Sequence, residues 1–279
     1  MTTTLQTTSP AQLNHLCIAS AQPERLAHFY STMLDCTASS FGQDHLMVGP
    51  ARAVLIRPAA ANGIAYVAYR VRDGQALETL SARVTANGVT CERFDDPLLE
   101  PGAFAVTDPQ GRRTAFGVPR GLPAHAGSPA RLQHTVFQTT ELDRVVRFYV
   151  DKIGFTVSDE VISEDSSTAT VFLRSDDEHH SLAFFRGSRN DWDHHCYETN
   201  EWNDIRDWGD RFAAAQIPIF FGPGRHGPGN NLFFMVTDPD GNCLEFSAEL
   251  QRVRADAAPG VWPESERTLN SWGRAWMRS

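Results

Sequence analysis

Histidine, a side chain that often binds metals or moves protons near neutral pH, is concentrated in the second half of this sequence. Two of these histidines, His134 and His194, stand in predicted strands, and Glu245 stands in a third. Two imidazoles and one carboxylate on one face can bind a divalent metal and leave coordination positions open. The pattern therefore predicts a metal site formed by His134, His194 and Glu245. The histidines of this half are His134, His179, His180, His194, His195 and His226.

The residues alone do not decide whether His194 or its neighbour His195 is the second histidine ligand. Neighbours on a strand point to opposite faces, so parity does not decide between His194 and His195. Cys196 and Cys243 lie two residues from His194 and Glu245, so zinc thiolate ligation is a formal alternative. The simpler interpretation is that both cysteines are small buried hydrophobic residues. The three predicted ligands could likewise be unrelated polar side chains on a sheet.

An internal repeat fixes the expected architecture. Residues 13–34 and 132–153 both place a histidine two residues after a leucine, and a Phe-Tyr pair 14 residues after that histidine. Residues 104–116 and 233–246 both contain an Asp-Pro-x-Gly β-turn between apolar stretches. Two homologous halves are therefore expected.

The two halves differ at the predicted ligands. The first half keeps only His15, while Tyr66 and Ala115 take the positions of the second histidine and of the glutamate. A repeat that retains its donors in one copy predicts a single metal, held by the second half.

Alternating apolar residues and helical stripes predict an α+β fold of paired βαβββ units in two homologous barrel-like domains. We expect an N-terminal domain without metal at 1–120, a Gly/Pro/Ala-rich linker at 121–130 and a metal-binding domain at 131–250. Residues 251–279 are expected to pack back on that domain through Trp262, Trp272 and Trp276. In the second half, the expected strands are 132–138, 170–173, 181–185, 194–199, 217–220, 232–237 and 243–247, and the expected helices are 141–153 and 202–215.

Composition excludes several classes of protein. The net charge of −9 argues against nucleic-acid binding, which requires clustered basic residues. No apolar run approaches the roughly 20 residues needed to cross a bilayer, and the polar first ten residues do not resemble a secretory signal. Five scattered cysteines fit a reduced protein better than a disulfide framework. We therefore expect a cytoplasmic protein that binds neither nucleic acid nor a membrane, while the charge says little about a small-molecule substrate.

Several motifs together resemble a known family. The second half is similar to the catalytic domain of the type I extradiol dioxygenases, in the vicinal oxygen chelate superfamily, and the whole chain resembles their two-domain form. The matching pieces are LQHTVF at 132–137, HHSLAF at 179–184, HHCYET with Trp202 at 194–202, GPGRHGPGNN at 222–231, DPDGNCLEF at 238–246 and the tail VWPESERTLNSWG at 261–273.

The resemblance implies roles for these residues. It favours His194 over His195 as the ligand beside His134 and Glu245, with iron(II) or, as in a few members, manganese(II) as the metal. It implies that His180 is the acid–base catalyst and partner of oxygen, and that His226 hydrogen-bonds a substrate oxygen. The implied reaction inserts both atoms of O2 into an aromatic vicinal diol and cleaves the ring next to the diol. Apart from this diol and O2, we expect a partner copy in a homo-oligomer.

One position departs from the family pattern. Met235 stands where the family usually has a tyrosine that hydrogen-bonds the substrate. An apolar thioether there favours a bulky or bicyclic diol over plain catechol. Phe184, Trp192 and Phe233 are candidates for the apolar pocket wall, although each fits the protein core equally well.

Three alternatives remain within the same superfamily. One is an enzyme like hydroxyphenylpyruvate dioxygenase, which shares the triad. The second is a glyoxalase- or epimerase-like enzyme, which uses four metal ligands and no oxygen. The third is a non-enzymatic ligand-binding module that requires no metal.

Overall fold

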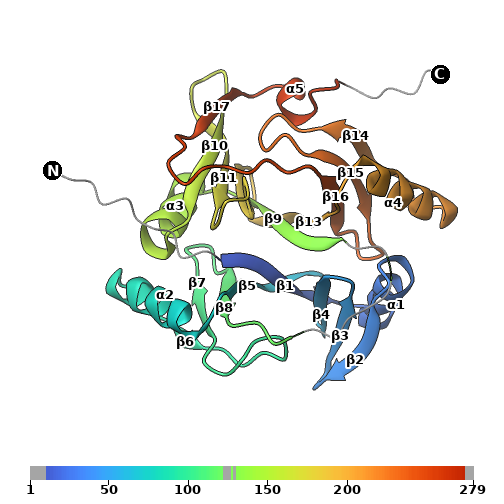
Figure 1. Ribbon diagram of the computed structural model, residues 1–279, viewed down its shortest axis with the longest axis horizontal. Coiled ribbons are helices and arrows are strands. Elements are labelled where there is room, and N and C mark those ends of the chain that lie inside the picture. The colour runs from blue at the N-terminus through green and yellow to red at the C-terminus, as the bar shows by residue number, and fades with distance from the viewer. Residues whose placement is uncertain (1–10, 122–126, 128–129, 274–279) are drawn as a thin grey trace.

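The computed structural model describes residues 11–121, 127 and 130–273, which fold as an α+β protein with two mixed sheets. In Figure 1 the first half of the chain, blue to green, lies below the second half, green to red. Most of the expected linker and Trp276 lie outside the described residues. The first sheet ends at Gly117 and the second begins at Arg131, so the change of sheet falls within the predicted linker region.

The first sheet has eight strands in the order β2-β3-β4-β1-β5-β8-β7-β6. Two helices, α1 (Pro23–Met33) and α2 (Gly74–Ala86), connect its strands. The strands are β1 (Ala11–Ser20), β2 (Thr37–Phe41), β3 (Asp44–Gly49), β4 (Arg52–Pro58), β5 (Gly63–Val71), β6 (Glu92–Arg93), β7 (Phe104–Thr107) and β8 (Arg113–Gly117).

The second sheet has nine strands in the order β14-β15-β16-β13-β9-β12-β11-β10-β17. Its helices are α3 (Leu142–Arg147), which continues into a π-helical turn at Phe148–Ile153, and α4 (Trp202–Ala214). The strands are β9 (Arg131–Thr139), β10 (Thr156–Ile162), β11 (Thr168–Arg174), β12 (Leu182–Arg186), β13 (Asp191–Glu198), β14 (Phe221–Arg225), β15 (Leu232–Thr237), β16 (Cys243–Ala248) and β17 (Gly260–Pro263).

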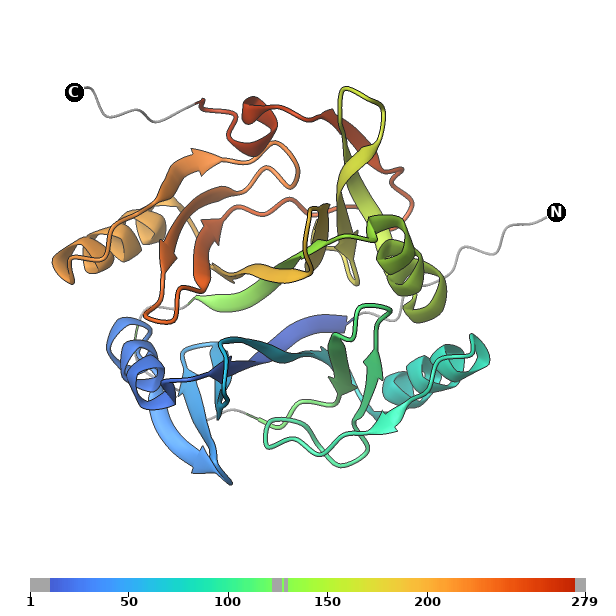
Figure 2. The same ribbon diagram turned by 180° about the vertical axis from the view of Figure 1, so that it is seen from behind.

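The repeat seen in the sequence reappears as one strand order used twice. When β17 is set aside, β10-β11-β12-β9-β13-β16-β15-β14 matches β2-β3-β4-β1-β5-β8-β7-β6 position by position. In both halves an Asp-Pro-x-Gly turn joins two antiparallel strands, β7 to β8 and β15 to β16, and a bond from the glycine N–H to the aspartate carbonyl closes it. Strands β1 and β9 lie side by side between the two halves, and the helices lie toward the outside (Figures 1 and 2).

The helices follow the periodicity of the sequence. In α4, Ile205, Trp208 and Phe212 are buried, and Trp208 packs against Phe246 of the sheet with ring centroids 4.6 Å apart. The predicted helix at 141–153 has its second half in a π-helical turn and ends at Gly154, whose φ of 101° is left-handed. Glycine adopts this conformation without a steric penalty, so it ends the helix where predicted.

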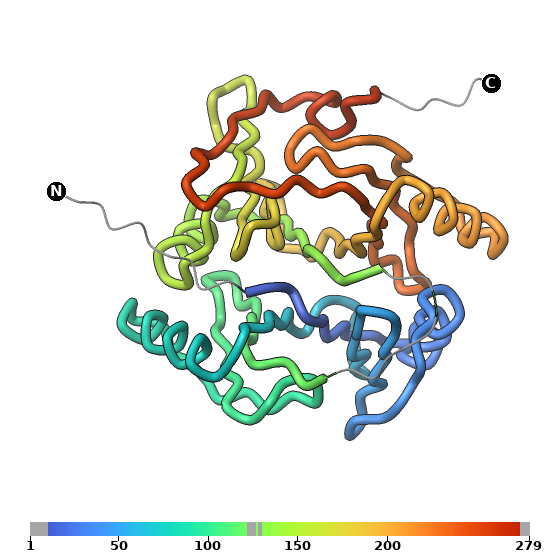
Figure 3. Tube along the Cα trace, viewed as in Figure 1, coloured from blue at the N-terminus to red at the C-terminus, as the bar shows by residue number. Residues whose placement is uncertain are grey.

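The described part of the tail after β16 returns across the second half. Strand β17 pairs in parallel with β10, which places Trp262 opposite Val161. A short helix, α5 (Glu266–Leu269), follows and approaches the loop after β14, where Gly227 N donates to the carbonyl of Thr268 at 2.9 Å. Figure 3 shows this red segment crossing the top of the half.

Two expectations about the elements were wrong. The predicted strand at 217–220 is not a strand, because Pro218 lacks an N–H for the ladder; β14 begins instead at Phe221. Strands β10 and β17 were not predicted, because β10 carries a polar pattern and β17 has only four residues. Among the helices of the described residues, none is long and apolar enough to span a bilayer.

Candidate metal centre and pocket

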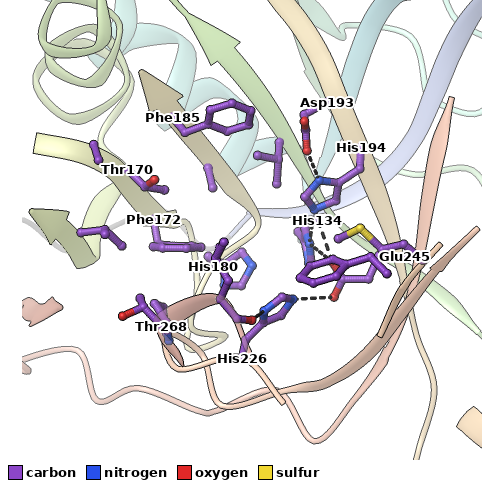
Figure 4. A pocket seen from close by; sticks show the side chains of 18 of the residues that line it. His134, Thr170, Phe172, His180, Phe185, Asp193, His194, His226, Glu245 and Thr268 are labelled. Atoms are coloured by element: carbon purple, nitrogen blue, oxygen red, sulfur yellow. Dashed lines mark hydrogen bonds and ion pairs between the residues drawn. The ribbon is translucent and has the colours of Figure 1, made fainter. Parts of the chain in front are cut away.

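Three neighbouring strands bring the predicted ligands together. Strands β9, β13 and β16 are adjacent, and their register places Cys196 between His134 and Glu245. His194 lies two residues before Cys196, so its side chain extends from the same face of β13. A single patch of the sheet thus carries the donors from three strands (Figure 4).

The donor atoms lie at the spacing of ligands to one ion. His134 Nε2 is 3.3 Å from His194 Nε2, and Glu245 Oε2 is 3.3 Å from His194 Nε2 and 3.6 Å from His134 Nε2. Donors about 2.1 Å from one ion, at angles of 90–109°, lie about 3.0–3.4 Å apart. His134 and Glu245 are buried, and His194 is nearly so. These residues therefore fit a divalent metal in size and in chemistry.

Each candidate ligand has a hydrogen-bond partner on its far side. His134 Nδ1 lies 2.5 Å from Gln133 Oε1, and His194 Nδ1 lies 2.5 Å from Asp193 Oδ1. An Nδ1–H donated to these oxygens leaves each Nε2 as a lone pair directed at the shared centre. Glu245 Oε1 accepts a 3.0 Å bond from Asn231 Nδ2.

The sequence patterns did not identify these three supporting residues as part of the site. Gln133 and Asp193 immediately precede the two histidines, and that adjacency was the available signal. Asn231 lies at the end of a Gly-rich loop, 14 residues before Glu245, and only the pairing of β15 with β16 brings it close.

The histidines around Glu245 favour the charged form of its carboxylate. Burial opposes ionisation of Glu245, but the neighbouring His134 and the hydrogen bonds of three histidines hold its pKa well below the usual value. Burial lowers the pKa of His134, which favours the neutral imidazole that binds metals. Burial also acts on His194, but Asp193 and Glu245 outweigh it and raise its pKa to about 9. Metal binding at His194 would therefore displace a proton.

The structure separates His194 from its neighbour. His195 points to the opposite face, where its ring stacks on Trp192 at 5.0 Å and its Nε2 lies 3.0 Å from the hydroxyl of Tyr30 in the other half of the chain. Burial lowers the pKa of His195 to about 3. This residue joins the two halves and is turned away from the other donors.

Sulfur donors are also close. The Cys196 Sγ and ligand atoms of His134 and Glu245 all lie within 4.8 Å of one another. Burial raises the pKa of the Cys196 thiol well above the usual value and also raises that of Cys243. The thiolate that zinc ligation requires is thus disfavoured in this protein environment.

A cavity of about 660 Å³ opens above the candidate ligands. Its wall includes His180, His226 and Met235, all singled out in the sequence. The tail contributes Glu264, Ser265, Glu266, Thr268 and Leu269 to the same wall. The apolar remainder is formed mainly by Val136, Val161, Ala169, Phe172, Ala183, Phe185, Phe220, Phe221, Pro228 and Cys243.

The two further histidines lie on one side of the centre (Figure 4). The ring of His180 is 4.4 Å from that of His134, and burial lowers the pKa of His180 well below its usual value. His226 Nε2 lies 3.7 Å from Glu245 Oε1, while its Nδ1 lies 2.5 Å from the carbonyl of Leu269. Neither lies on the strands of the three candidate ligands, so both can interact with a molecule bound there.

Three of the proposed wall residues need correction. Phe184 is fully buried beneath β12 and stacks on Phe137, because Ala183 and Phe185 take the cavity side of that strand. Trp192 lies on the His195 face and donates to Thr135 Oγ1 at 2.8 Å. Phe233 is fully buried and lies flat under His226, with ring centroids 3.7 Å apart. Phe233 therefore supports a wall residue without lining the cavity.

The first half has a different cluster at the equivalent place. His15 Nε2 lies 3.0 Å from Asp96 Oδ2, and the Tyr66 hydroxyl donates to the same oxygen at 2.6 Å. Ala115 occupies the position of the glutamate. In the first half, Asp96 is thus the hydrogen-bond partner of His15. At the equivalent place in the second half, the donor atoms of the candidate metal ligands face one another.

Comparison with known proteins agrees with the fold. The Glyoxalase/Bleomycin resistance protein/Dioxygenase superfamily profile matches residues 131–246. Metapyrocatechase 2 of Cupriavidus necator is 32% identical over 149 residues, covering 52% of this chain and 45% of that protein. The 3-methylcatechol 2,3-dioxygenase of Pseudomonas putida is 25% identical, covering 67% of this chain and 70% of that protein. The chain therefore aligns with less than half the length of the first relative.

Solved structures share the arrangement of the whole chain. The 2,3-dioxygenase LapB of Pseudomonas sp. KL28 superposes with a TM-score of 0.82 at 19% identity, covering 92% of this chain and 99% of LapB. A Mn(II)-bound glyoxalase of Novosphingobium aromaticivorans gives 0.79 at 24% identity, covering 96% and 92%. Among further relatives, one is named iron-dependent and another manganese-dependent.

Residues 131–246 of the second half are thus similar to the Glyoxalase/Bleomycin resistance protein/Dioxygenase superfamily. The fold is the paired βαβββ arrangement shared with the solved structures. Relatives that match it in sequence are named metapyrocatechase, 3-methylcatechol 2,3-dioxygenase, biphenyl-2,3-diol 1,2-dioxygenase and iron-dependent extradiol dioxygenase.

Proposed function

We propose that this protein is an extradiol dioxygenase whose metal is held by His134, His194 and Glu245. The main support is the convergence of three buried donor atoms, 3.3–3.6 Å apart, at the base of an apolar cavity. Iron(II) is the proposed metal and manganese(II) the alternative, since the relatives include proteins named for each. Three protein donors leave positions for both oxygens of a diol and for O2.

The proposed reaction joins an aromatic vicinal diol and O2, with no other reactant. When bound, the metal would orient the diol and O2 and carry electron density between them. The ring bond next to the diol breaks, and both oxygen atoms stay in the open-chain product.

The histidines of the cavity wall would move and hold protons. His180, kept neutral by burial, would accept a proton from one diol hydroxyl and return it later. His226, whose Nδ1 faces the carbonyl of Leu269, would present Nε2 to a substrate oxygen near Glu245. Their positions on one side of the cavity support these roles.

We propose that the diol is uncharged and bears a bulky apolar substituent, such as a second ring. Met235 lies beside Glu245 in the β15–β16 ladder and lines the cavity. Among the described wall residues, Arg186 is the only arginine or lysine, and it bonds Asp143 Oδ1 at 3.1 Å. A carboxylate on the substrate would thus enter a cavity with no unpaired arginine or lysine among its described wall residues, at a cost in desolvation. Acidic wall residues would add repulsion: Asp193, Glu264 and Glu266.

An anaerobic titration tests this function. The iron-loaded protein would be mixed with catechol, 3-methylcatechol, a dihydroxybiphenyl, a dihydroxynaphthalene and 3,4-dihydroxyphenylacetate, and O2 would then be added. Equimolar O2 uptake with a yellow ring-fission product is expected, and it should be fastest with the bicyclic diols. The absence of ring cleavage with every diol, in protein shown to hold its metal, would refute the proposal.

A glyoxalase-type reaction is the second candidate, because a Mn(II)-bound glyoxalase shares the fold. Such an enzyme would isomerise a thiol adduct of an α-ketoaldehyde and would consume no oxygen. Turnover of that adduct by the manganese-loaded protein, with no O2 uptake on any diol, would favour this alternative.

A further inference from the structure

A row of buried side chains connects the tail to the cavity. Trp262 Nε1 of β17 donates to Asp159 Oδ2 at 2.7 Å, and Gly260 N donates to Asp159 Oδ1 at 3.1 Å. His179 Nε2 lies 3.0 Å from Asp159 Oδ2, and its Nδ1 lies 2.9 Å from Nδ1 of His180. The row therefore runs from Trp262 through Asp159 and His179 to His180.

All three central members are shielded from solvent. The exposed fractions are 8% for Asp159, 2% for His179 and 3% for His180. Burial alone would raise the pKa of Asp159, yet His179 and the donors of the tail hold it below the usual value. Asp159 is thus a charged acceptor that takes hydrogen bonds from Trp262 and Gly260 and has His179 Nε2 at ion-pair distance.

An ionised carboxylate can only accept hydrogen bonds, so Asp159 determines which ring nitrogens of His179 and His180 carry a hydrogen. It requires a hydrogen on His179 Nε2. A neutral imidazole carries one N–H, so Nδ1 of His179 is then an acceptor. Nδ1 of His180 must donate to it, which leaves Nε2 of His180 without a proton. His180 is then prepared to accept a proton in the cavity.

We propose that Asp159 is a positioning residue that fixes, through His179, the ring nitrogen of His180 that carries its proton. This inference rests on the proposed function, because it assigns His180 the role of base. The same carboxylate anchors Trp262, so the tail segment that lines the cavity and the orientation of His180 depend on one group.

Asp159→Asn is the sharpest perturbation, because it keeps the shape and replaces one accepting oxygen by a donating NH2. Oδ1 faces one donor and Oδ2 faces two, so either orientation of the amide places its NH2 against an N–H. When the NH2 faces His179, that ring must present a lone pair, and His180 Nε2 then carries the hydrogen. Asp165→Asn, in the exposed turn between β10 and β11, is the matched control.

The first readout is the position of the protons, independent of activity. Histidine labelled with ¹⁵N in the full chain, loaded with Zn²⁺ as a diamagnetic ion, reports which ring nitrogens are protonated. We expect Nε2–H on His179 and Nδ1–H on His180 in the wild type and in Asp165→Asn. In Asp159→Asn, the protons should move at both rings wherever the new NH2 faces His179. A wild-type His180 protonated at Nε2, or doubly protonated His179, would overturn the proposal without requiring any variant to fold.

The second readout is turnover by the iron-loaded protein. Asp159→Asn should lower kcat by at least about tenfold, within the 10²–10⁴-fold that a positioned acid–base group contributes. KM for the diol should change by less than about threefold, and metal content should be unchanged. A loss confined to KM, or an equal loss in Asp165→Asn, would contradict the positioning role. If the wild type cleaves no diol, the proposed function fails, whereas the proton positions still test the row.

Discussion

Removal of the carboxylate behind His194 should weaken metal binding without touching a ligand. Asp193 Oδ1 lies 2.5 Å from His194 Nδ1, so it orients the ring and makes Nε2 a better donor. Loss of such a partner typically costs about 10–100-fold in metal affinity. The Asp193 side chain is 41% exposed, and solvent screens its charge, so the lower end of that range is expected.

The expected loss of metal affinity in each variant depends on which hydrogen-bonding group the substitution retains. Asp193→Ala should weaken Mn²⁺ binding about tenfold, which corresponds to about 1.4 kcal/mol. Asp193→Asn keeps an oxygen acceptor but loses the charge, so a loss of about threefold is expected. Asp191→Asn is the control, because Asp191 lies on the same strand but contacts no ligand: it pairs with the exposed Arg189 and accepts a bond from Trp192 N.

Competition against a chromophoric chelator measures these dissociation constants. The reasoning would be refuted by an Asp193→Ala protein whose Kd is within twofold of the wild type. Equal losses in Asp193→Ala and Asp191→Asn would show a general effect of charge on the cation, not support of one ligand.

Four further predictions concern other parts of the chain. The wild type should bind one Mn²⁺ per chain by elemental analysis, and Glu245→Ala should bind none; full occupancy in that variant would exclude the proposed triad. His180→Phe should keep its metal and lose about 10²–10⁴-fold in turnover, and metal loss would contradict its role as base. Met235→Tyr should shift the ratio of kcat/KM toward catechol and away from bicyclic diols; an unchanged ranking would show that position 235 does not select the substrate. Burial raises the pKa of Asp238 to about 6 from 3.8, so its ionisation lowers folding stability as pH rises through this interval. Asp238→Asn should therefore gain roughly 1–3 kcal/mol at pH 7 and little at pH 4 in urea unfolding; an equal gain at both values would show a different cause.

Local patterns in the sequence predicted the repeated architecture and the candidate metal ligands. Spacings around His15 and His134, and two Asp-Pro-x-Gly turns, predicted two halves, and one strand order does occur twice. Helical stripes and stop signals such as Gly154 are local, so they predicted helix positions within a few residues. His134 and Glu245 were candidates because imidazole and carboxylate are suitable donors for a divalent metal, and because the first half of the repeat has alanine in place of the glutamate.

Which side chains of neighbouring strands lie on the same face of the sheet follows from strand register, which requires the three-dimensional structure. Parity could not distinguish His194 from His195, and the register of β13 between β9 and β16 places His194 with the other donors. The same register places Trp192 on the face opposite the cavity, beside His195. The alternation of side chains along β12 points Phe184 away from the cavity, against Phe137.

Contacts between segments far apart in the chain could not be predicted from the sequence either. Asn231 reaches Glu245 through a hairpin, and Asp159 meets Trp262 only because β17 returns to pair with β10, more than 100 residues later in the chain. Local patterns carry the period of a helix or strand, since that period depends on neighbouring residues. Register and pairing depend on contacts summed over the whole fold, and no single stretch of sequence contains them.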